Sequence, residues 1–227
     1  MNVVGLSEDG GVLFEQQLGH GADPVTLAFD LGYVVVEAVD ARRGSDGVIS
    51  LSFRVRACTG ESRPELPGRG LDPGIRLAGE GPVEVRQRLA AYALVTSDAG
   101  LLATEFSHRT AAPGRWGPPG GGVEEYEQPR EALLREVAEE TQQTVDLGRL
   151  LRVLTSHWVG RSPRGTIEDF HAVRLVYAAT CSNPTPPVVA DLDGTTESAR
   201  WVPVTDWQSL AWSSVWRQVL SDWLGPG

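Results

Sequence analysis

The sequence predicts an α/β protein with a small β-rich region at its N-terminus. Residues 1–58 carry strand signals, and from residue 83 onward strands alternate with helices. Between these stretches, residues 59–82 are dense in Gly and Pro, which favour neither helix nor strand interiors. We therefore expect two parts: a β-rich N-terminal region with its linker over 1–82, and an α/β domain over 83–227.

The clearest element of the N-terminal region is a β-hairpin. Residues 34–36 are three consecutive valines, and residues 49–56 alternate apolar and polar side chains as a half-buried strand does. The segment 41–47 between them is rich in turn-forming residues. These features predict two strands joined by that segment.

The second part shows strands and helices in alternation. A helix is predicted over residues 128–142, where apolar residues recur at a spacing of three to four. A C-terminal helix is predicted from Thr205 and Gln208, which have the spacing of a capping box. Its tryptophans recur at helical spacing, which favours core packing or a contact in a homodimer. Strands are predicted over residues 89–96, 101–107, 148–157, 170–180 and 199–204.

Composition narrows the classes of function. The 227 residues carry a formal net charge of -10, which disfavours nucleic acid as a partner because a net negative field repels a polyanion. There is no apolar run of about 18 residues, so no membrane span is expected. The first residues have no signal-peptide pattern, so the expected location is the cytoplasm. Cys58 and Cys181 form no CxxC pair, so neither a disulfide framework nor a structural zinc site is expected.

Three acidic residues make the first predicted helix a candidate metal site. On a helix, Glu136, Glu139 and Glu140 stand at i, i+3 and i+4, so their carboxylates project from one face. Such crowded charges repel one another unless a cation lies among them, and hard carboxylate oxygens favour Mg2+, with Mn2+ as a substitute. A glutamate-rich helix face is more often only a solvated surface, so the loop before the helix decides between the two interpretations.

That loop has the features of a ligand-binding loop. Gly120, Gly121 and Gly122 allow backbone groups to approach a ligand closely. Glu127 favours the positive end of the helix dipole and can reach Arg135, which would fix the loop onto the helix.

Loop and helix together resemble the sequence box of the Nudix hydrolase family. The family pattern is Gly, five residues, Glu, seven residues, Arg-Glu, an aliphatic residue, any residue, Glu-Glu, any residue and Gly. The sequence matches it in register at Gly121, Glu127, Arg135, Glu136, Val137, Glu139 and Glu140. The box covers residues 121–143 and the wider resemblance about residues 88–224, but Gln142 stands where the family has Gly. Since that Gly ends the helix in a left-handed conformation, we expect either a slightly longer helix or about 1–2 kcal/mol of strain at Gln142.

The resemblance implies a fold and a reaction. The fold is an α/β/α sandwich around a mixed sheet. The reaction is Mg2+-dependent hydrolysis of a nucleoside diphosphate linked to another moiety, by attack of water at phosphorus. The substrate would be a small nucleotide: a nucleoside triphosphate, a nucleotide sugar or a compound of the ADP-ribose class. The alternative is a catalytically weak nucleotide-binding sensor, or a regulatory module, on the same fold. Residues 1–82 would then mediate regulation, whereas in an enzyme they would select the substrate or form a dimer contact.

The resemblance also implies roles for the residues of the box. Glu136, Glu139 and Glu140 would bind Mg2+, with the carbonyl of Gly121 as a further ligand. Arg135 would pair with Glu127 and orient the acids, and Glu136 is the preferred general base.

Residues outside the box would complete the site. In some family members the base comes from a distant loop, and the candidates here are Glu197, Asp193, Glu168 and Asp169. The candidates for stacking on a nucleobase are Trp116, Trp158 and Phe170, although buried packing is the more common role of such rings. His157 and His171 fall on predicted strands, where histidines are usually structural.

Overall fold

The computed structural model describes residues 1–65, 68–75, 83–162, 165–190 and 194–225. It has a mixed α/β fold with a curled mixed sheet and few helices, which confirms the predicted fold class. The chain forms two compact units, each assembled from separate segments. The first unit comprises residues 1–90, 122–129 and 150–176, and the second comprises residues 91–121, 130–149 and 177–227.

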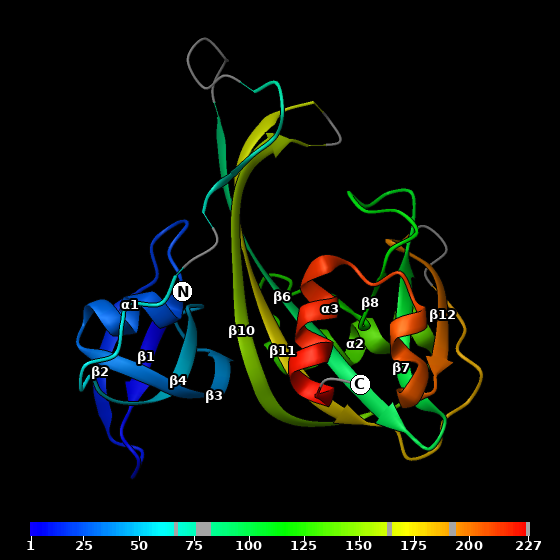
Figure 1. Cartoon of the computed structure of the whole chain (residues 1–227), viewed down its shortest axis with the longest axis horizontal. Helices are drawn as coiled ribbons and strands as arrows, with labels where there is room; N and C mark the ends of the chain where they lie inside the picture. Colours follow the sequence, from blue (N-terminus) through cyan, green and yellow to red (C-terminus); the bar gives the residue numbers. More distant parts are fainter. Residues whose placement is uncertain (66–67, 76–82, 163–164, 191–193, 226–227) are drawn as a thin grey trace. The chain divides into compact units, whose positions relative to one another are not determined.

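The N-terminal part of the first unit is a four-stranded sheet with the order β2-β1-β4-β3 (Figure 1). Its strands are β1 (Asn2–Leu6), β2 (Val12–Gln17), β3 (Tyr33–Arg43) and β4 (Ile49–Ala57). β1 pairs with β4 in parallel, and β3 and β4 form the predicted antiparallel hairpin. Alternate side chains of a strand share a face, and the apolar residues that β4 buries are Ile49, Leu51, Phe53 and Val55.

A larger sheet has the strand order β12-β7-β6-β11-β10-β5, with β8 paired to β7 and β9 paired to β6. Its strands are β5 (Gly70–Leu71), β6 (Glu84–Ser97), β7 (Gly100–Phe106), β8 (Trp116–Gly117), β9 (Gly120–Gly122), β10 (Asp146–Arg161), β11 (Ile167–Thr180) and β12 (Thr196–Val202). The five strands predicted for residues 83–227 are all present. β6, β10 and β11 are longer than predicted, and β12 begins and ends earlier than the predicted range 199–204. β5 lies within the Gly/Pro-rich stretch and pairs in parallel with β10. Residues 66–67 and 76–82 of that stretch lie outside the described residues.

A short helix, α1 (Pro24–Asp30), connects β2 to β3 and was not predicted, because seven residues give too short a periodic pattern. Its cap is Asp23, whose Oδ1 accepts hydrogen bonds from the backbone N–H groups of Val25 (2.9 Å) and Thr26 (3.1 Å). The Oδ2 atom of Asp23 accepts a hydrogen bond from the hydroxyl of Thr155 on β10, at 2.6 Å. This one side chain therefore caps the helix and fixes the loop before it to β10.

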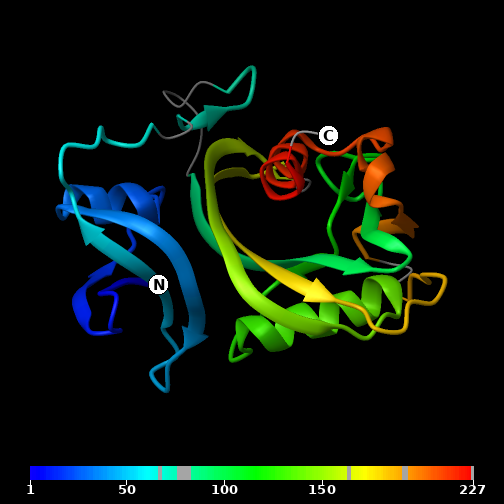
Figure 2. The ribbon, with the colours of Figure 1, turned by 60° about the horizontal axis from the view of Figure 1, so that its bottom comes forward.

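Two longer helices, α2 (Pro129–Thr141) and α3 (Ser214–Leu224), lie on opposite faces of the sheet in the second unit (Figure 2). The ring of Trp216 on α3 packs against Tyr92 on β6, with the ring centroids 4.7 Å apart. Trp212, Trp216 and Val219 are buried, so these residues of the stripe serve core packing, one of the two roles predicted, whereas Val215 is 43% exposed. Within the described residues, no helix has the length and apolar character needed to cross a membrane.

The predicted capping box is wrong. Thr205 and Gln208 lie in a short 3-10 helix, η1 (Val204–Ser209), which has no side-chain cap hydrogen bond. The backbone is extended at Leu210, where ψ is 149°, so η1 cannot continue into α3. The helix begins instead after Ser213, which is its N-cap residue.

Candidate active site

Helix α2 brings the three predicted metal ligands to one pocket of the second unit. Its apolar side is fixed in the core, because Leu133 and Val137 are fully buried. The pocket is lined by Glu136, Glu139, Glu140, Val189, Gly194, Thr195 and Thr196. The i, i+3, i+4 spacing in the sequence therefore places the three carboxylates as expected.

Glu140 is the most enclosed of the three acids, with 7% of its surface exposed. Its Oε1 atom accepts a hydrogen bond from the hydroxyl of Thr196 on β12, and its Oε2 atom accepts one from the backbone N–H of Gly120 at 2.8 Å. Burial raises its pKa to about 7, and the charges of Glu136 and Glu139 add to this effect, while the two hydrogen bonds oppose it. Because the carboxyl is buried beside two other acids, its ionised form needs a nearby cation to stabilise it.

Arg135 partly supplies that positive charge. Its Nη1 group donates hydrogen bonds to Glu136 Oε1 at 2.9 Å and to Glu139 Oε2 at 3.1 Å. One guanidinium thus contacts two of the three carboxylates and offsets their mutual repulsion.

The glycines before the helix let the backbone lie directly against the acids. A Cβ atom on Gly121 would lie 2.5 Å from the carboxylate carbon of Glu136, so no larger residue fits there without moving that carboxylate. Gly120 has φ +142°, and a Cβ atom there would lie 2.2 Å from the carbonyl oxygen of Ala91. Three carboxylates beside a close backbone segment form an all-oxygen donor set, which fits a hard divalent cation such as Mg2+.

The loop that leads into α2 is fixed by a residue that sequence reasoning missed. Arg43, at the end of β3, donates from Nε to the carbonyl of Glu127 (3.0 Å) and from Nη2 to the carbonyl of Glu124 (3.2 Å). Its backbone N–H donates to Gln128 Oε1 (2.9 Å), and Gln128 Nε2 donates back to the carbonyl of Arg43 (3.0 Å). A separation of more than 80 positions hides this contact from any local pattern.

Within the same loop, Glu127 turns back on the backbone, where its Oε2 accepts a hydrogen bond from the N–H of Glu124 at 3.1 Å. Glu127 belongs to the first unit and Arg135 to the second, so their pairing stays a prediction.

The helix ends where the family pattern has its Gly, although the residue is Gln142. Gln142 has φ +53° and donates its backbone N–H to the carbonyl of Ala138 at 2.9 Å. Of the two outcomes expected, the left-handed conformation is the one adopted. Gln143 replaces an aliphatic residue and is buried, but its amide is satisfied by the backbone N–H (3.0 Å) and hydroxyl (2.9 Å) of Thr185.

The candidates for a distant base occupy different surroundings. Glu197 is exposed on β12, directly after Thr196. Glu168 forms an ion pair with Arg86 at 3.3 Å. Asp193 lies outside the described residues.

Asp169 contacts three basic side chains, His20 (3.0 Å), His157 (2.5 Å) and Arg69 (2.6 Å). Desolvation opposes its ionisation, but hydrogen bonds from the two histidines and the charge of Arg69 outweigh this and lower its pKa.

The three aromatic candidates also differ. Trp116 is 4% exposed, and the guanidinium carbon of Arg200 lies 4.3 Å from its ring centroid. One ring face of Trp116 is thus covered by a cation. Trp158 and Phe170, in the first unit, are half-buried and pack against each other with centroids 4.5 Å apart and planes tilted by 34°.

Comparisons with known proteins identify the family of the chain. Residues 86–224 match the family model of the NUDIX domain, and a search of curated proteins found no match. Among solved structures, the MutT NUDIX hydrolase from Burkholderia pseudomallei is similar, with 27% identity, a TM-score of 0.46 and coverage of 60% of this chain and 97% of that one. The MutT protein from Methanosarcina mazei Go1 has 17% identity and a TM-score of 0.47, with 63% and 96% covered. Since the family model spans more than half of the chain, this protein belongs to the Nudix family and is a hydrolase acting on phosphorus-containing anhydrides.

Proposed function

We propose that the protein is a Mg2+-dependent pyrophosphohydrolase that cleaves a nucleoside diphosphate linked to another moiety, by attack of water at phosphorus. The observation that carries this proposal is the pocket in which Glu136, Glu139 and Glu140 meet, with the backbone of Gly121 against the Glu136 carboxylate. Among the described residues that line the pocket, three are acidic, none is basic and Val189 is the one apolar side chain, so a cation is the partner that this charge favours.

In this proposal, Glu136, Glu139 and Glu140 hold Mg2+, or Mn2+ in its place, and the carbonyl of Gly121 is a further ligand. The bound cation supplies positive charge to phosphate oxygens and lowers the pKa of a coordinated water. Arg135 keeps the carboxylates of Glu136 and Glu139 in place through its two hydrogen bonds.

The remaining proposed roles, which are to position the acids and to activate the attacking water, belong to side chains of the protein. Gly120 and Thr196 hold Glu140 at both oxygens, so this acid stays fixed during turnover. Glu136 is the proposed base for the attacking water, and the exposed Glu197 is the alternative because it follows Thr196 on β12. Glu127 is proposed to pair with Arg135, as the resemblance implies.

For the nucleobase, Trp158 and Phe170 are the better stacking candidates. Both are only half-buried, whereas Trp116 is enclosed and already stacked by Arg200.

We further propose that the β-rich residues 1–82 position the loop that leads into α2. The support for this role is the set of hydrogen bonds from Arg43 to the segment from Glu124 to Gln128. In this proposal, the N-terminal part contributes to catalysis by positioning that loop.

A phosphate-release screen tests the reaction. The full chain is incubated with Mg2+ and a panel of nucleoside triphosphates, nucleotide sugars and ADP-ribose, and a coupled phosphatase reports any phosphate set free from the products. We expect turnover of at least one class, lost when EDTA replaces Mg2+. Tight binding of one compound without turnover of any would instead establish the nucleotide sensor.

A further inference from the structure

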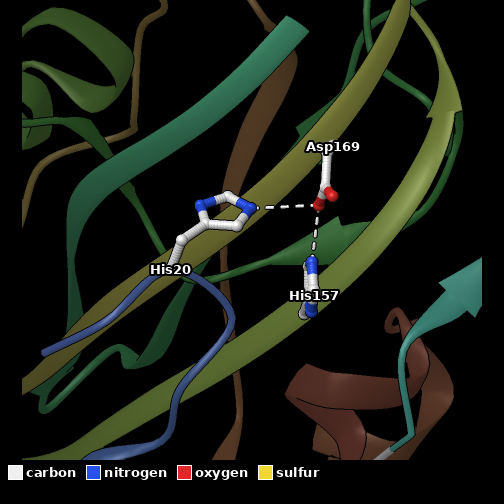
Figure 3. Close-up of side chains that lie close together, drawn as sticks. All are labelled: His20, His157 and Asp169. Atoms are coloured by element: carbon white, nitrogen blue, oxygen red, sulfur yellow. Dashed lines mark hydrogen bonds and ion pairs between the residues drawn. The ribbon is translucent and has the colours of Figure 1, made fainter. Parts of the chain in front are cut away.

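Two histidines and an aspartate converge in the first unit, outside the acidic pocket (Figure 3). His20 comes from the loop before α1, His157 from β10 and Asp169 from β11. The Nε2 atoms of His20 and His157 lie 3.0 Å and 2.5 Å from the same atom, Asp169 Oδ1. The three potential ligand atoms lie within 4.8 Å of one another. Two imidazole nitrogens and a carboxylate oxygen thus face one small volume.

The loop that carries His20 is built to hold this arrangement. Gly21 has φ +73°, and a Cβ atom there would lie 2.5 Å from His157 Nδ1, so the glycine backbone presses directly on the His157 ring. The Nδ1 side of that ring is therefore covered, and its Nε2 side faces Asp169. Asp23 secures the same loop to β10 through the hydroxyl of Thr155 at 2.6 Å.

The carboxylate is oriented from its other side. Arg69, just before β5, donates to Asp169 Oδ2 at 2.6 Å. Because Oδ2 is held by the guanidinium, Oδ1 remains directed at the two imidazoles. Hydrogen bonds of this kind from outer residues fix the direction of metal-binding carboxylates.

The three side chains of the cluster are partly exposed to solvent. The side chains of His20, His157 and Asp169 are 27%, 20% and 16% exposed. They are shielded enough to be held in place and open enough for an ion to enter.

We propose that His20, His157 and Asp169 bind one divalent transition-metal ion, with Zn2+ as the best match. Imidazole nitrogens suit Zn2+, whereas Mg2+ prefers oxygen-only sites. At Zn–N and Zn–O bond lengths of about 2.0–2.2 Å, tetrahedral ligand atoms lie about 3.3 Å apart, so only small side-chain shifts are needed. Water would take the fourth position.

Such an ion would join the loop before α1 to β10 and β11. Sequence reasoning did not find this cluster, because the expectation of no zinc site rested on the cysteines. His20 and Asp169 are separated by 149 positions. The competing interpretation is a hydrogen-bonded His–Asp–His cluster that needs no ion.

Metal titration of the full chain distinguishes a metal site from a hydrogen-bonded cluster that needs no ion. The protein is stripped with EDTA, exchanged into excess Mg2+ to occupy the acidic pocket, and titrated with Co2+ as a spectroscopic stand-in and then with Zn2+. We expect one Co2+ per chain with visible absorption bands of a nitrogen-containing site, displaced by Zn2+. His20→Gln and His157→Gln should each weaken binding by more than about tenfold. His108→Gln is the matched control and should bind as the wild type does, because His108 is exposed and outside the cluster.

Thermal unfolding gives a second, independent measurement. Zn2+ should raise the Tm of the wild type and of His108→Gln but not that of His20→Gln, because a ligand stabilises only the fold that binds it. Absence of stoichiometric binding, or equal affinity in wild type, His20→Gln and His157→Gln, would overturn the proposal and leave the hydrogen-bonded cluster. If His157→Gln does not fold, His20→Gln on the loop decides alone. No substrate is involved, so this result is separate from that of the nucleotide screen.

Discussion

Glu139 and Glu140 are neighbours in sequence with opposite surroundings. The side chain of Glu139 is 46% exposed and held on one side by Arg135, whereas Glu140 is buried and held by Thr196 and Gly120. The exposed acid can adjust to a ligand, while the buried one defines a fixed point of the pocket. Both are proposed metal ligands, so both can be tested by the same isosteric change.

Glu139→Gln and Glu140→Gln should each lower kcat by at least about 100-fold, equivalent to ~2.7 kcal/mol of barrier, because an amide is a weaker cation ligand. Phosphate release measures the rate, and circular dichroism checks that each variant is folded. Glu125→Gln, an exposed glutamate of the loop before α2 that is not a match to the box, should retain the wild-type rate. Wild-type rates in both pocket variants would refute the metal assignment.

Gln142 carries a backbone conformation that favours glycine. At φ +53° a side chain costs roughly 1–2 kcal/mol, whereas glycine pays only its larger loss of chain entropy on folding. Gln142→Gly should therefore raise the free energy of unfolding by up to about 1 kcal/mol, as measured by urea denaturation. Gln142→Ala, which keeps the Cβ atom, should bring no gain. Destabilisation by the glycine would show that the glutamine side chain contributes more than its backbone costs.

At the scale of elements, the contact of β3 with the loop into α2 is the main surprise. The hairpin β3–β4 was predicted from alternation in residues 49–56, and α2 from its spacing of apolar residues. Their connection through Arg43 was not predicted, because periodicity describes one element at a time. The failed capping box at Thr205 has a related cause, because spacing alone does not show that the backbone becomes extended at Leu210 and that Trp212 then forms a bridge with Trp116.

Arg43→Ala should lower kcat by about tenfold or more, since small displacements of residues that position a catalytic group are costly. It removes the side-chain bonds to the carbonyls of Glu127 and Glu124. Steady-state kinetics on the substrate found in the screen give kcat and KM separately. Arg42→Ala, whose side chain is 80% exposed, is the control and should change neither.

Arg43→Lys should restore part of the rate, because one cationic donor can still reach a carbonyl of the loop. If Arg43→Ala lowers only the Tm and leaves kcat per folded molecule intact, Arg43 has a structural role alone.

At the scale of the whole molecule, acid stability depends on a histidine buried in the first unit. Burial lowers the pKa of His171 to about 4, and the nearby His20 and His157 add to this effect. As the pH falls through 6.5, the unfolded chain takes up a proton at this histidine, whereas the folded chain does so only near 4. At this histidine the unfolded state thus binds more protons in that window, so the contribution of His171 to stability falls as the pH drops from about 6.5 to about 4.

The contribution of His171 is seen by comparing variants in urea denaturation between pH 7 and pH 4, with EDTA present. The wild type should lose stability relative to His171→Gln by up to about 1.4 kcal/mol per pH unit in that window. His108→Gln should follow the wild type, because its histidine is exposed. Parallel curves for wild type and His171→Gln would contradict the assignment.

The sequence predicted the parts of the site that lie close together along the chain, and it did not predict contacts between distant segments. The acids of α2 and the glycines before them form one continuous stretch, so spacing sufficed to bring them together. Thr196 and Arg43 come from remote segments and carry no motif of their own, so only the folded chain shows them beside the box. Gln142 was predicted in part: the pattern identified its position as the helix end but did not decide its backbone conformation.

The path of the chain through the two units has a consequence for engineering. The chain passes from one unit to the other after residues 90, 121, 129, 149 and 176, so neither unit is a continuous stretch of sequence. A single cut anywhere in the gene therefore yields no fragment that encodes one complete unit without also encoding part of the other. Shuffling or transplanting this enzyme as modules would divide strands in their middle, and the contribution of its N-terminal residues has to be measured by point substitution in the intact chain.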